Sequence, residues 1–157
     1  MYWRLSHADF EAQSGEANRQ HMRAIVESGE VPGLLAYMNG EPAGWVALAP
    51  REAYFRLAHS RILKPVDDQS VWSVVCFFVT RRFRRQGLTV ELLKQAAVYA
   101  RRQGAHILEG YPVEPSEQNA PPVFVYTGLA SAFLQAGYHE VLRRSEKRPI
   151  MRYFIEE

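Results

Sequence analysis

The stretch VWSVVCFFVTRRFRRQGLTVELL, residues 71–93, contains the change of pattern that decides the fold. Its first part, Val71 to Val79, is almost entirely apolar and rich in β-branched and aromatic residues. Such a run is typical of a central strand that is covered on both faces. A basic loop follows, and from Leu88 the apolar residues return at helical spacing. We therefore predict a buried strand, a basic turn and a helix in direct succession.

The helix is expected to continue to Gln103. Its apolar positions, Leu92, Leu93, Ala96 and Ala100, fall on one face, and a glycine stands just beyond its end. The next segment, AHILEGYPV over residues 105–113, is predicted to be a second strand. A strand, a helix and another strand in this order favour a sheet with a crossover helix.

The other elements are shorter. We expect a helix interrupted by a glycine, a hairpin around an Asn-Gly turn, two short helices and two final strands. In chain order these are Asp9–Gly29 with its break near Gly15, LLAYM and AGWVALA around Asn39-Gly40, Ala53–Ser60, Gly128–Ala136, YHEVLR and PIMRYFI. The pattern predicts an α/β (α+β) fold with one layer of sheet and helices packed on it.

Composition places limits on the class of protein. The chain has 157 residues, is 47% hydrophobic and 23% charged, and has no internal repeat or long linker, so one domain over residues 1–157 is expected. A single cysteine excludes an internal disulfide, and five scattered histidines show no metal-ligand spacing. No apolar run approaches the roughly 18 residues of a membrane span, and no signal peptide is evident. These features predict a cytoplasmic protein with no metal and no membrane partner.

The basic turn has the chemistry of an anion site. The first N–H groups of a helix lack intrahelical acceptors, and the helix dipole adds positive potential there. Gly87 lets a ligand approach the backbone, and Arg84 and Arg85 add full positive charges just before it. A strand, a basic loop, a glycine and a helix thus form a suitable cradle for a pyrophosphate. The spacing fits neither a P-loop nor a dinucleotide-binding fingerprint.

This junction resembles the coenzyme A-binding motif of the GNAT N-acetyltransferase superfamily, which reads roughly Arg/Gln-x-x-Gly-x-Gly/Ala after a strand. The matching residues are Arg84-Arg85-Gln86-Gly87-Leu88-Thr89, preceded by Phe83 and by the strand-end Val79. Downstream, LLKQAAVYARRQGAHILEGYPV and FLQAGYHEV resemble the family's alanine-rich helix, next strand and later Gly-aromatic helix end. Thr89 departs from the family's small final residue. The resemblance covers residues 71 to about 141.

The resemblance implies a fold, a co-substrate and a reaction. It implies a mixed central sheet of about six to seven strands with helices on both faces. Acetyl-CoA, or another acyl-CoA, would be the co-substrate, and an amine of a small molecule or peptide would attack its thioester directly. The residues implied to bind the pantetheine are Phe77, Phe78 and Val79, and those implied to bind the pyrophosphate are Arg84, Arg85, Gln86, Gly87, Leu88 and Thr89.

Catalytic residues are less clearly indicated. Phe133 occupies the position where many relatives carry a tyrosine as general acid, and phenylalanine cannot donate a proton. Tyr126 is the first alternative acid and Tyr111 the second. Glu109 is the first candidate for the base, although it could instead be a surface carboxylate or a structural partner of an arginine. Other carboxylates in adjoining loops, which are weaker candidates, are Asp67, Asp68 and Glu114.

Several alternative functions remain at this point. A different acyl chain, an oxygen nucleophile or a non-catalytic CoA-sensing domain would use the same fold, and Phe133 supports the last of these. A nucleic-acid-binding module would use the basic loop and a second cluster at Arg143–Arg148, but the net charge is only +2 and no recognition motif accompanies them, so no nucleic-acid partner is expected. Homodimers are common among relatives, so a homodimer is possible. No motif identifies the acceptor.

Overall fold

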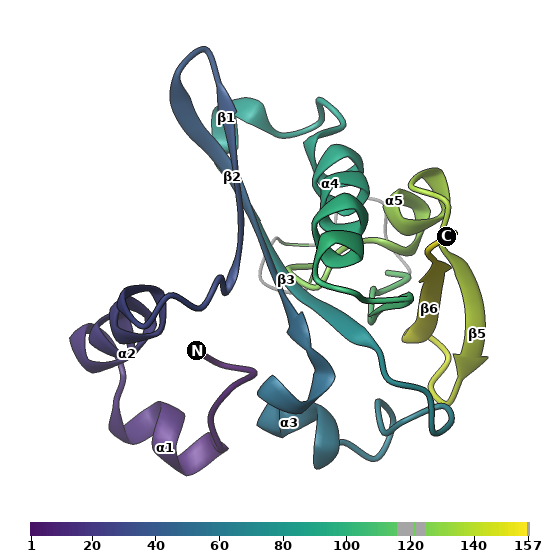
Figure 1. Cartoon of the computed structure of the whole chain (residues 1–157), viewed down its shortest axis with the longest axis horizontal. Coiled ribbons are helices and arrows are strands. Elements are labelled where there is room, and N and C mark those ends of the chain that lie inside the picture. Colours follow the sequence, from purple (N-terminus) through teal and green to yellow (C-terminus); the bar gives the residue numbers. More distant parts are fainter. Residues whose placement is uncertain (116–120, 122–124, 157) are drawn as a thin grey trace.

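The computed structural model describes residues 1–115, 121 and 125–156. Six strands form one mixed sheet in the order β1-β2-β3-β4-β6-β5 (Figure 1). The strands are β1 (Gly33–Met38), β2 (Glu41–Pro50), β3 (Trp72–Val79), β4 (Ile107–Gly110), β5 (His139–Arg143) and β6 (Pro149–Phe154). The α-helices are α1 (His7–Ala12), α2 (Glu16–Glu27), α3 (Phe55–Ala58), α4 (Leu88–Arg102) and α5 (Ala130–Gln135), and 3-10 turns lie at η1 (Arg51–Ala53) and η2 (Arg81–Phe83).

Helices cover both faces of the sheet, as the sequence predicted. On one face, α4 and α5 pack against an apolar cluster that includes Val46, Val74 and Phe77. On the other face, Tyr54 and Leu57 of the η1–α3 region pack in a second cluster. Helices α1 and α2 lie apart from α4 and α5, on the side of the N-terminus (Figure 1). In the described part of the chain, no helix is long and apolar enough to cross a membrane.

The predicted strand–turn–helix succession is confirmed. Strand β3 ends at Val79, the 3-10 turn η2 carries the first arginines, and α4 begins at Leu88 after Gly87, whose φ of 76° is left-handed. The apolar face of α4 that the spacing predicted is fully buried against the sheet. The hairpin turn at Asn39-Gly40 and the helix break at Gly15 are also present, each with a positive φ.

Strands β3 and β4 pair only over a short distance. They are parallel, with partners from Trp72↔Leu108 to Val74↔Gly110, whereas every other pair of neighbouring strands is antiparallel. Strand β4 ends at Gly110, and β3 continues to Val79. The second half of β3 is therefore free of β4 on that side, and the candidate site is at this divergence.

Two predicted elements are shorter than expected. The strand expected over residues 105–113 ends at Gly110, and beyond it Val113 forms only an isolated bridge to Leu129. Pro112 has no N–H to donate, which explains why the ladder stops. The helix expected over Ala53–Ser60 is divided into η1 and α3, with Tyr54 in a non-helical conformation between them.

Candidate active site

The loop before α4 presents a row of free backbone donors. Within the described part of the chain, the N–H groups of Arg85, Gln86 and Gly87 meet no hydrogen-bond acceptor. The first N–H that continues the helical ladder is that of Glu91, which donates to the Gly87 carbonyl at 3.1 Å. The N–H groups of the first turn of α4 are therefore also available, as at any helix start. Arg85 has a φ of 60°, which together with Gly87 curls the loop around these donors.

The arginines of the loop have different surroundings. Nε of Arg84 donates to the Val79 carbonyl at 3.0 Å and ties the loop to the end of β3. Arg82 pairs with Glu41 of the hairpin. Among the described residues, no side chain or carbonyl accepts a hydrogen bond from the guanidinium of Arg85. Neither Arg84 nor Arg85 has an acidic partner among the described residues, and Arg85 is the one of the two whose guanidinium makes no hydrogen bond to them.

Two backbone N–H groups of β3 point to the side where β4 has diverged, and one of them is already hydrogen-bonded. The Phe77 N–H donates to the Tyr126 carbonyl at 2.7 Å, while the Thr80 N–H donates to Ala43 on the other side. Because successive N–H groups of a strand point to opposite sides, the Val79 N–H points to the same open side as that of Phe77. Phe78, with a side chain 57% exposed, lies between them. Of the three predicted pantetheine residues, Val79 therefore offers the available N–H.

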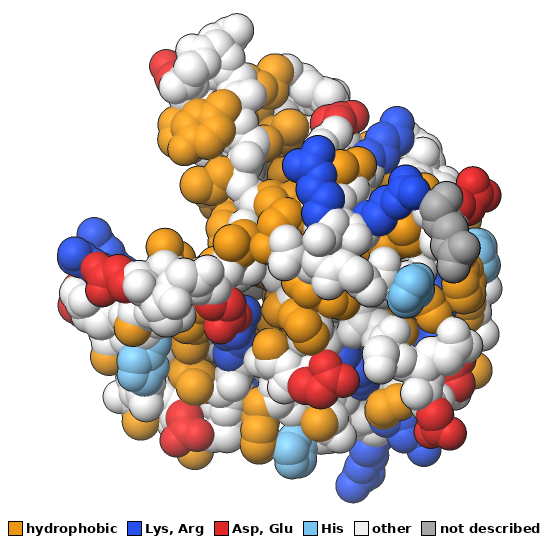
Figure 2. Space-filling model, in the orientation of Figure 1, with side chains coloured by type: hydrophobic (Ala, Val, Ile, Leu, Met, Phe, Trp, Pro, Cys, Tyr) orange, Lys and Arg blue, Asp and Glu red, His pale blue; other side chains and the backbone are white. Residues whose placement is uncertain are grey.

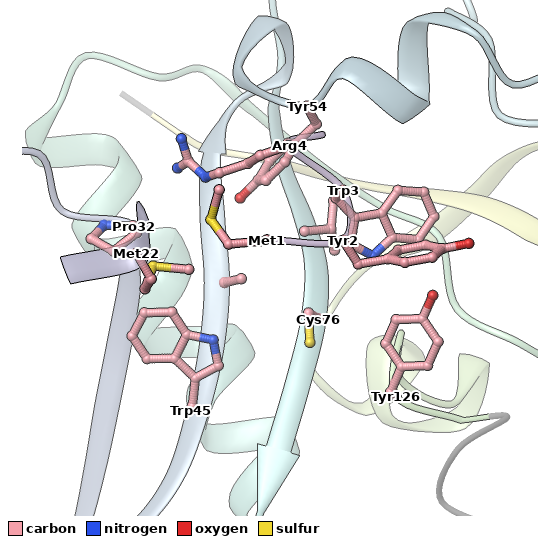
Figure 3. Close-up of a pocket in the computed structure, with 12 residues that line it drawn as sticks. Met1, Tyr2, Trp3, Arg4, Met22, Pro32, Trp45, Tyr54, Cys76 and Tyr126 are labelled. Atoms are coloured by element: carbon pink, nitrogen blue, oxygen red, sulfur yellow. The ribbon is translucent and has the colours of Figure 1, made fainter. Parts of the chain in front are cut away.

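A hollow of about 430 Å³ lies on the face of β3 opposite to α4 (Figure 3). Figure 3 shows Trp45 of β2, Cys76 of β3 and Tyr126 around one space, with the N-terminal residues Met1 to Arg4 across it. Among the described residues that line it, none is Asp or Glu. The hollow therefore suits an apolar or aromatic group.

Tyr126 lies at the edge of this hollow and is half-buried. Its ring meets that of Tyr2 edge to face, with centroids 6.3 Å apart. Burial raises the pKa of Tyr126 to about 12. The phenol is consequently protonated at neutral pH and can act as a proton donor.

Glu109 lies in β4 and is only 1% exposed. Its carboxylate accepts hydrogen bonds from Arg152 at 2.8 Å, Arg51 at 3.1 Å and the Tyr111 hydroxyl at 2.8 Å. Arg152 also pairs with Asp67 at 2.6 Å. Glu109 and Tyr111 thus lie together in a buried network, and neither lines the hollow beside Cys76. This placement matches the structural alternative for Glu109 that the sequence left open.

Comparisons with known proteins show the family and the fold. The sequence pattern of the acetyltransferase (GNAT) family matches residues 1–125. The protein belongs to the GNAT acetyltransferase family. A search of curated protein sequences found no match.

Solved structures share the GNAT fold at low sequence identity. A protein from Salmonella typhimurium, named as an acetyltransferase and solved with acetyl-CoA, is 16% identical, with a TM-score of 0.57 over 92% of this chain and 76% of its own. A GNAT acetyltransferase from Streptococcus pneumoniae is 15% identical, with a TM-score of 0.56 over 91% and 78%. One from Streptococcus agalactiae is 12% identical, with a TM-score of 0.57 over 95% and 79%.

Phe133, which the sequence resemblance places where many relatives carry a tyrosine, is fully buried in this chain. Its ring packs edge to face on Phe77 and Tyr138, with centroids 6.0 and 5.0 Å apart. It also lies against Gly110 and Gly128, where a Cβ atom would come within 3 Å of the ring. Phe133 therefore holds α5 against β3 and β4.

Some residues around the hollow were not anticipated. Trp45 and Cys76 are both only partly buried and line the hollow. The N-terminal Tyr2 and Trp3 contribute a wall that no motif indicated. Between β4 and α5, residues 116–120 and 122–124 lie outside the described residues.

Proposed function

We propose that this GNAT acetyltransferase uses acetyl-CoA and transfers its acetyl group to the amine of a small molecule or peptide by direct attack. The observation that carries the proposal is the row of free N–H groups at Arg85, Gln86 and Gly87, which leads into α4 beside the open end of β3. Membership of the family supports the activity. The donor row supports binding of the pyrophosphate.

The rest of the predicted coenzyme site follows from the same loop. Arg85 adds an unpaired positive charge, and Leu88 and Thr89 contribute first-turn N–H groups. Thr89 is partly buried at the start of α4. Its φ is negative, as in any α-helix, so its branched side chain is compatible with the turn. The Val79 N–H, pointing to the open side of β3, is suited to pair with an amide of the pantetheine.

The chemistry requires little from the protein besides position and proton transfer. The amine nitrogen forms a bond to the acetyl carbonyl carbon, and the carbon–sulfur bond breaks. Tyr126 supplies a proton to the departing thiolate. After the attack the nitrogen loses a proton to water, because the residues described around the hollow include no carboxylate, and Tyr126 regains a proton from water. A base role for Glu109 stays a prediction, and its two arginine partners count against it.

Calorimetric titration with acetyl-CoA tests the proposal. Gly87→Glu places a carboxylate at the pyrophosphate cradle and is expected to abolish micromolar binding of acetyl-CoA. Gly87→Gln carries the same backbone strain without the charge and is expected to bind acetyl-CoA more tightly than Gly87→Glu does. Gly104→Glu is the matched control, since Gly104 has a similar φ of 81° in open space at the other end of α4. Equal binding by all three variants, or no binding by the folded wild type, would refute the pyrophosphate site.

A non-catalytic CoA-binding domain is the alternative that Phe133 favours, because the usual acid is replaced by a core residue. The two functions differ in one measurement. A catalyst releases free CoA from acetyl-CoA when a suitable amine is added, and a sensor binds acetyl-CoA without release. A panel of amines, assayed for thiol release with the binding-deficient Gly87→Glu variant as blank, separates them.

A further inference from the structure

A second hollow, of about 480 Å³, shares a wall with the apolar hollow. Tyr2, Trp3 and Tyr126 line both, so the two spaces lie against the same aromatic side chains. The second space differs in charge: Arg56 and Arg148 line it, and no Asp or Glu is among the described residues around it. It is therefore a cationic space next to the candidate general acid.

Arg148 has no acidic partner among the described residues. Among the described residues, no carboxylate or carbonyl accepts a hydrogen bond from its guanidinium, and its Nε is buried without a partner. Burial lowers the pKa of Arg148. Its neighbours in the sequence are different, because Arg143 pairs with Glu140 and Glu114, and Arg144 donates to three carbonyls.

Arg56 supplies the second free donor. Its Nε donates to the Leu5 carbonyl at 3.1 Å, and its guanidinium lies 3.7 Å from the centre of the Tyr2 ring. These contacts fix the orientation of the guanidinium, but its Nη2 is buried and has no partner in the described part of the chain. The charges of Arg148 and Arg56 both act on the Tyr126 hydroxyl and oppose the effect of burial on its pKa.

A half-buried guanidinium without a partner is costly, because its N–H groups lose water and gain nothing in return. A single carboxylate would accept hydrogen bonds from such a group with good geometry. The paired arginines of the protein show the same chemistry, since Arg152 holds Asp67 and Glu109. Among the described residues, the cationic hollow therefore lacks the acidic partner that Arg51 and Arg152 have.

We propose that Arg148 and Arg56 bind a carboxylate of the acceptor, so that the acceptor is a small amino acid-like molecule with an apolar or aromatic body. The proposal rests on the proposed function. In an α-amino acid one carbon separates the carboxylate from the amine, so a carboxylate at Arg148 keeps the amine beside Tyr126. The apolar hollow with Trp45 and Cys76 receives the side chain. Polyamines and other acceptors without an anionic group would leave both guanidinium groups unpaired.

Two ligands that differ only in the carboxylate test this class of acceptor. Phenylalanine carries the carboxylate, and 2-phenylethylamine lacks it. The wild type is expected to favour phenylalanine in kcat/KM by about tenfold to a hundredfold, the range for hydrogen bonds to charged groups. Arg148→Gln is expected to remove most of this preference, and Arg148→Lys part of it. Lys147→Gln, which removes an exposed neighbouring charge, is the control and should retain the preference.

A binding measurement separates this inference from the proposed function. 3-Phenylpropionate has the carboxylate and the ring but no amine, so its binding can be followed by calorimetry without turnover. Binding that is lost in Arg148→Gln and kept in Lys147→Gln would support the carboxylate site even if no acetyl transfer occurred. No binding to the wild type, stronger displacement by inorganic phosphate than by acetate, or equal use of the two amines would overturn it. Loss of acetyl-CoA binding alone would overturn only the proposed function.

Discussion

Tyr126 is the residue that we propose as the proton donor. It borders both hollows, and with a pKa of about 12 it keeps its proton at neutral pH. Tyr126→Phe is expected to lower kcat by about a hundredfold, at the lower end of the usual effect of a general acid, with little change in acetyl-CoA affinity. Steady-state kinetics together with calorimetry check both parts.

The control for Tyr126→Phe is Tyr138→Phe. Tyr138 is also buried and its hydroxyl has no partner among the described residues, but it lies in the core on the α4 face. Its replacement should leave kcat unchanged. A Tyr126→Phe enzyme with wild-type kcat would show that the departing thiolate takes its proton from water.

Glu109 is expected to act on stability rather than on catalysis. Glu109→Gln would leave Arg51 and Arg152 without their shared carboxylate inside the protein. Removing one partner of a buried ion pair costs about 3–5 kcal/mol of unfolding free energy, which urea denaturation can measure. Glu140→Gln, at an exposed pair with Arg143, should cost no more than about 1 kcal/mol. Unchanged stability with lost kcat would instead identify Glu109 as the base.

From the sequence, Glu109 could be either a general base or a structural partner of an arginine, because the residues around it in the chain do not indicate which side chains it contacts. Those partners, Arg51 and Arg152, lie 58 and 43 residues away along the chain. Only the pairing of β4 with β6, and the position of η1, bring them to the same carboxylate. Residue roles that depend on such long-range contacts cannot be derived from local pattern.

At the scale of elements, local pattern was sufficient. The apolar run of β3, the start of the helix just after Gly87 and the apolar face of α4 are each determined by neighbouring residues, and all were predicted. The errors occurred where a single residue interrupts a pattern. Pro112 stops the strand expected over residues 105–113 soon after the end of β4. Tyr54 divides the helix expected over Ala53–Ser60.

The packing of α5 on β4 depends on Gly110. A Cβ atom at this position would lie 2.1 Å from Cε1 of Phe133, and Phe133 is enclosed by Phe77 and Tyr138. Gly110→Ala is therefore expected to lower the unfolding free energy by about 1–3 kcal/mol, as overpacked cores do. Combining it with Phe133→Leu should recover part of that loss. If the double variant lost as much unfolding free energy in urea denaturation as the sum of the two single variants, the methyl group added at position 110 and the ring of Phe133 would not compete for space.

At the scale of the whole molecule, the candidate site combines segments that the sequence keeps far apart. The apolar hollow needs Trp3, Trp45, Cys76 and Tyr126, which come from the N-terminus, β2, β3 and the segment before α5. Figure 2 shows hydrophobic side chains along the hairpin side of the notch that separates the hairpin from the N-terminal helices. The loop between β3 and α4 was predictable because its residues are contiguous, whereas the apolar hollow was not, because it is assembled by the tertiary fold.

The same long-range assembly predicts how the molecule responds to acid. Hydrogen bonds from Arg152 lower the pKa of Asp67 from 3.8 to about 2, and Arg152 in turn holds Glu109 of β4. Because the folded pKa is depressed, the stability from this pair is fully present above about pH 4 and is lost as the pH falls towards 2. Asp67→Asn should therefore lower the urea midpoint at neutral pH and make its decline between about pH 4 and pH 2 shallower. Asp68→Asn changes an exposed neighbouring carboxylate and should show the same dependence of the urea midpoint on pH as the wild type. If the urea midpoints of the wild type and Asp67→Asn fell in parallel between about pH 4 and pH 2, the Asp67–Arg152 pair would not link the loop to the sheet.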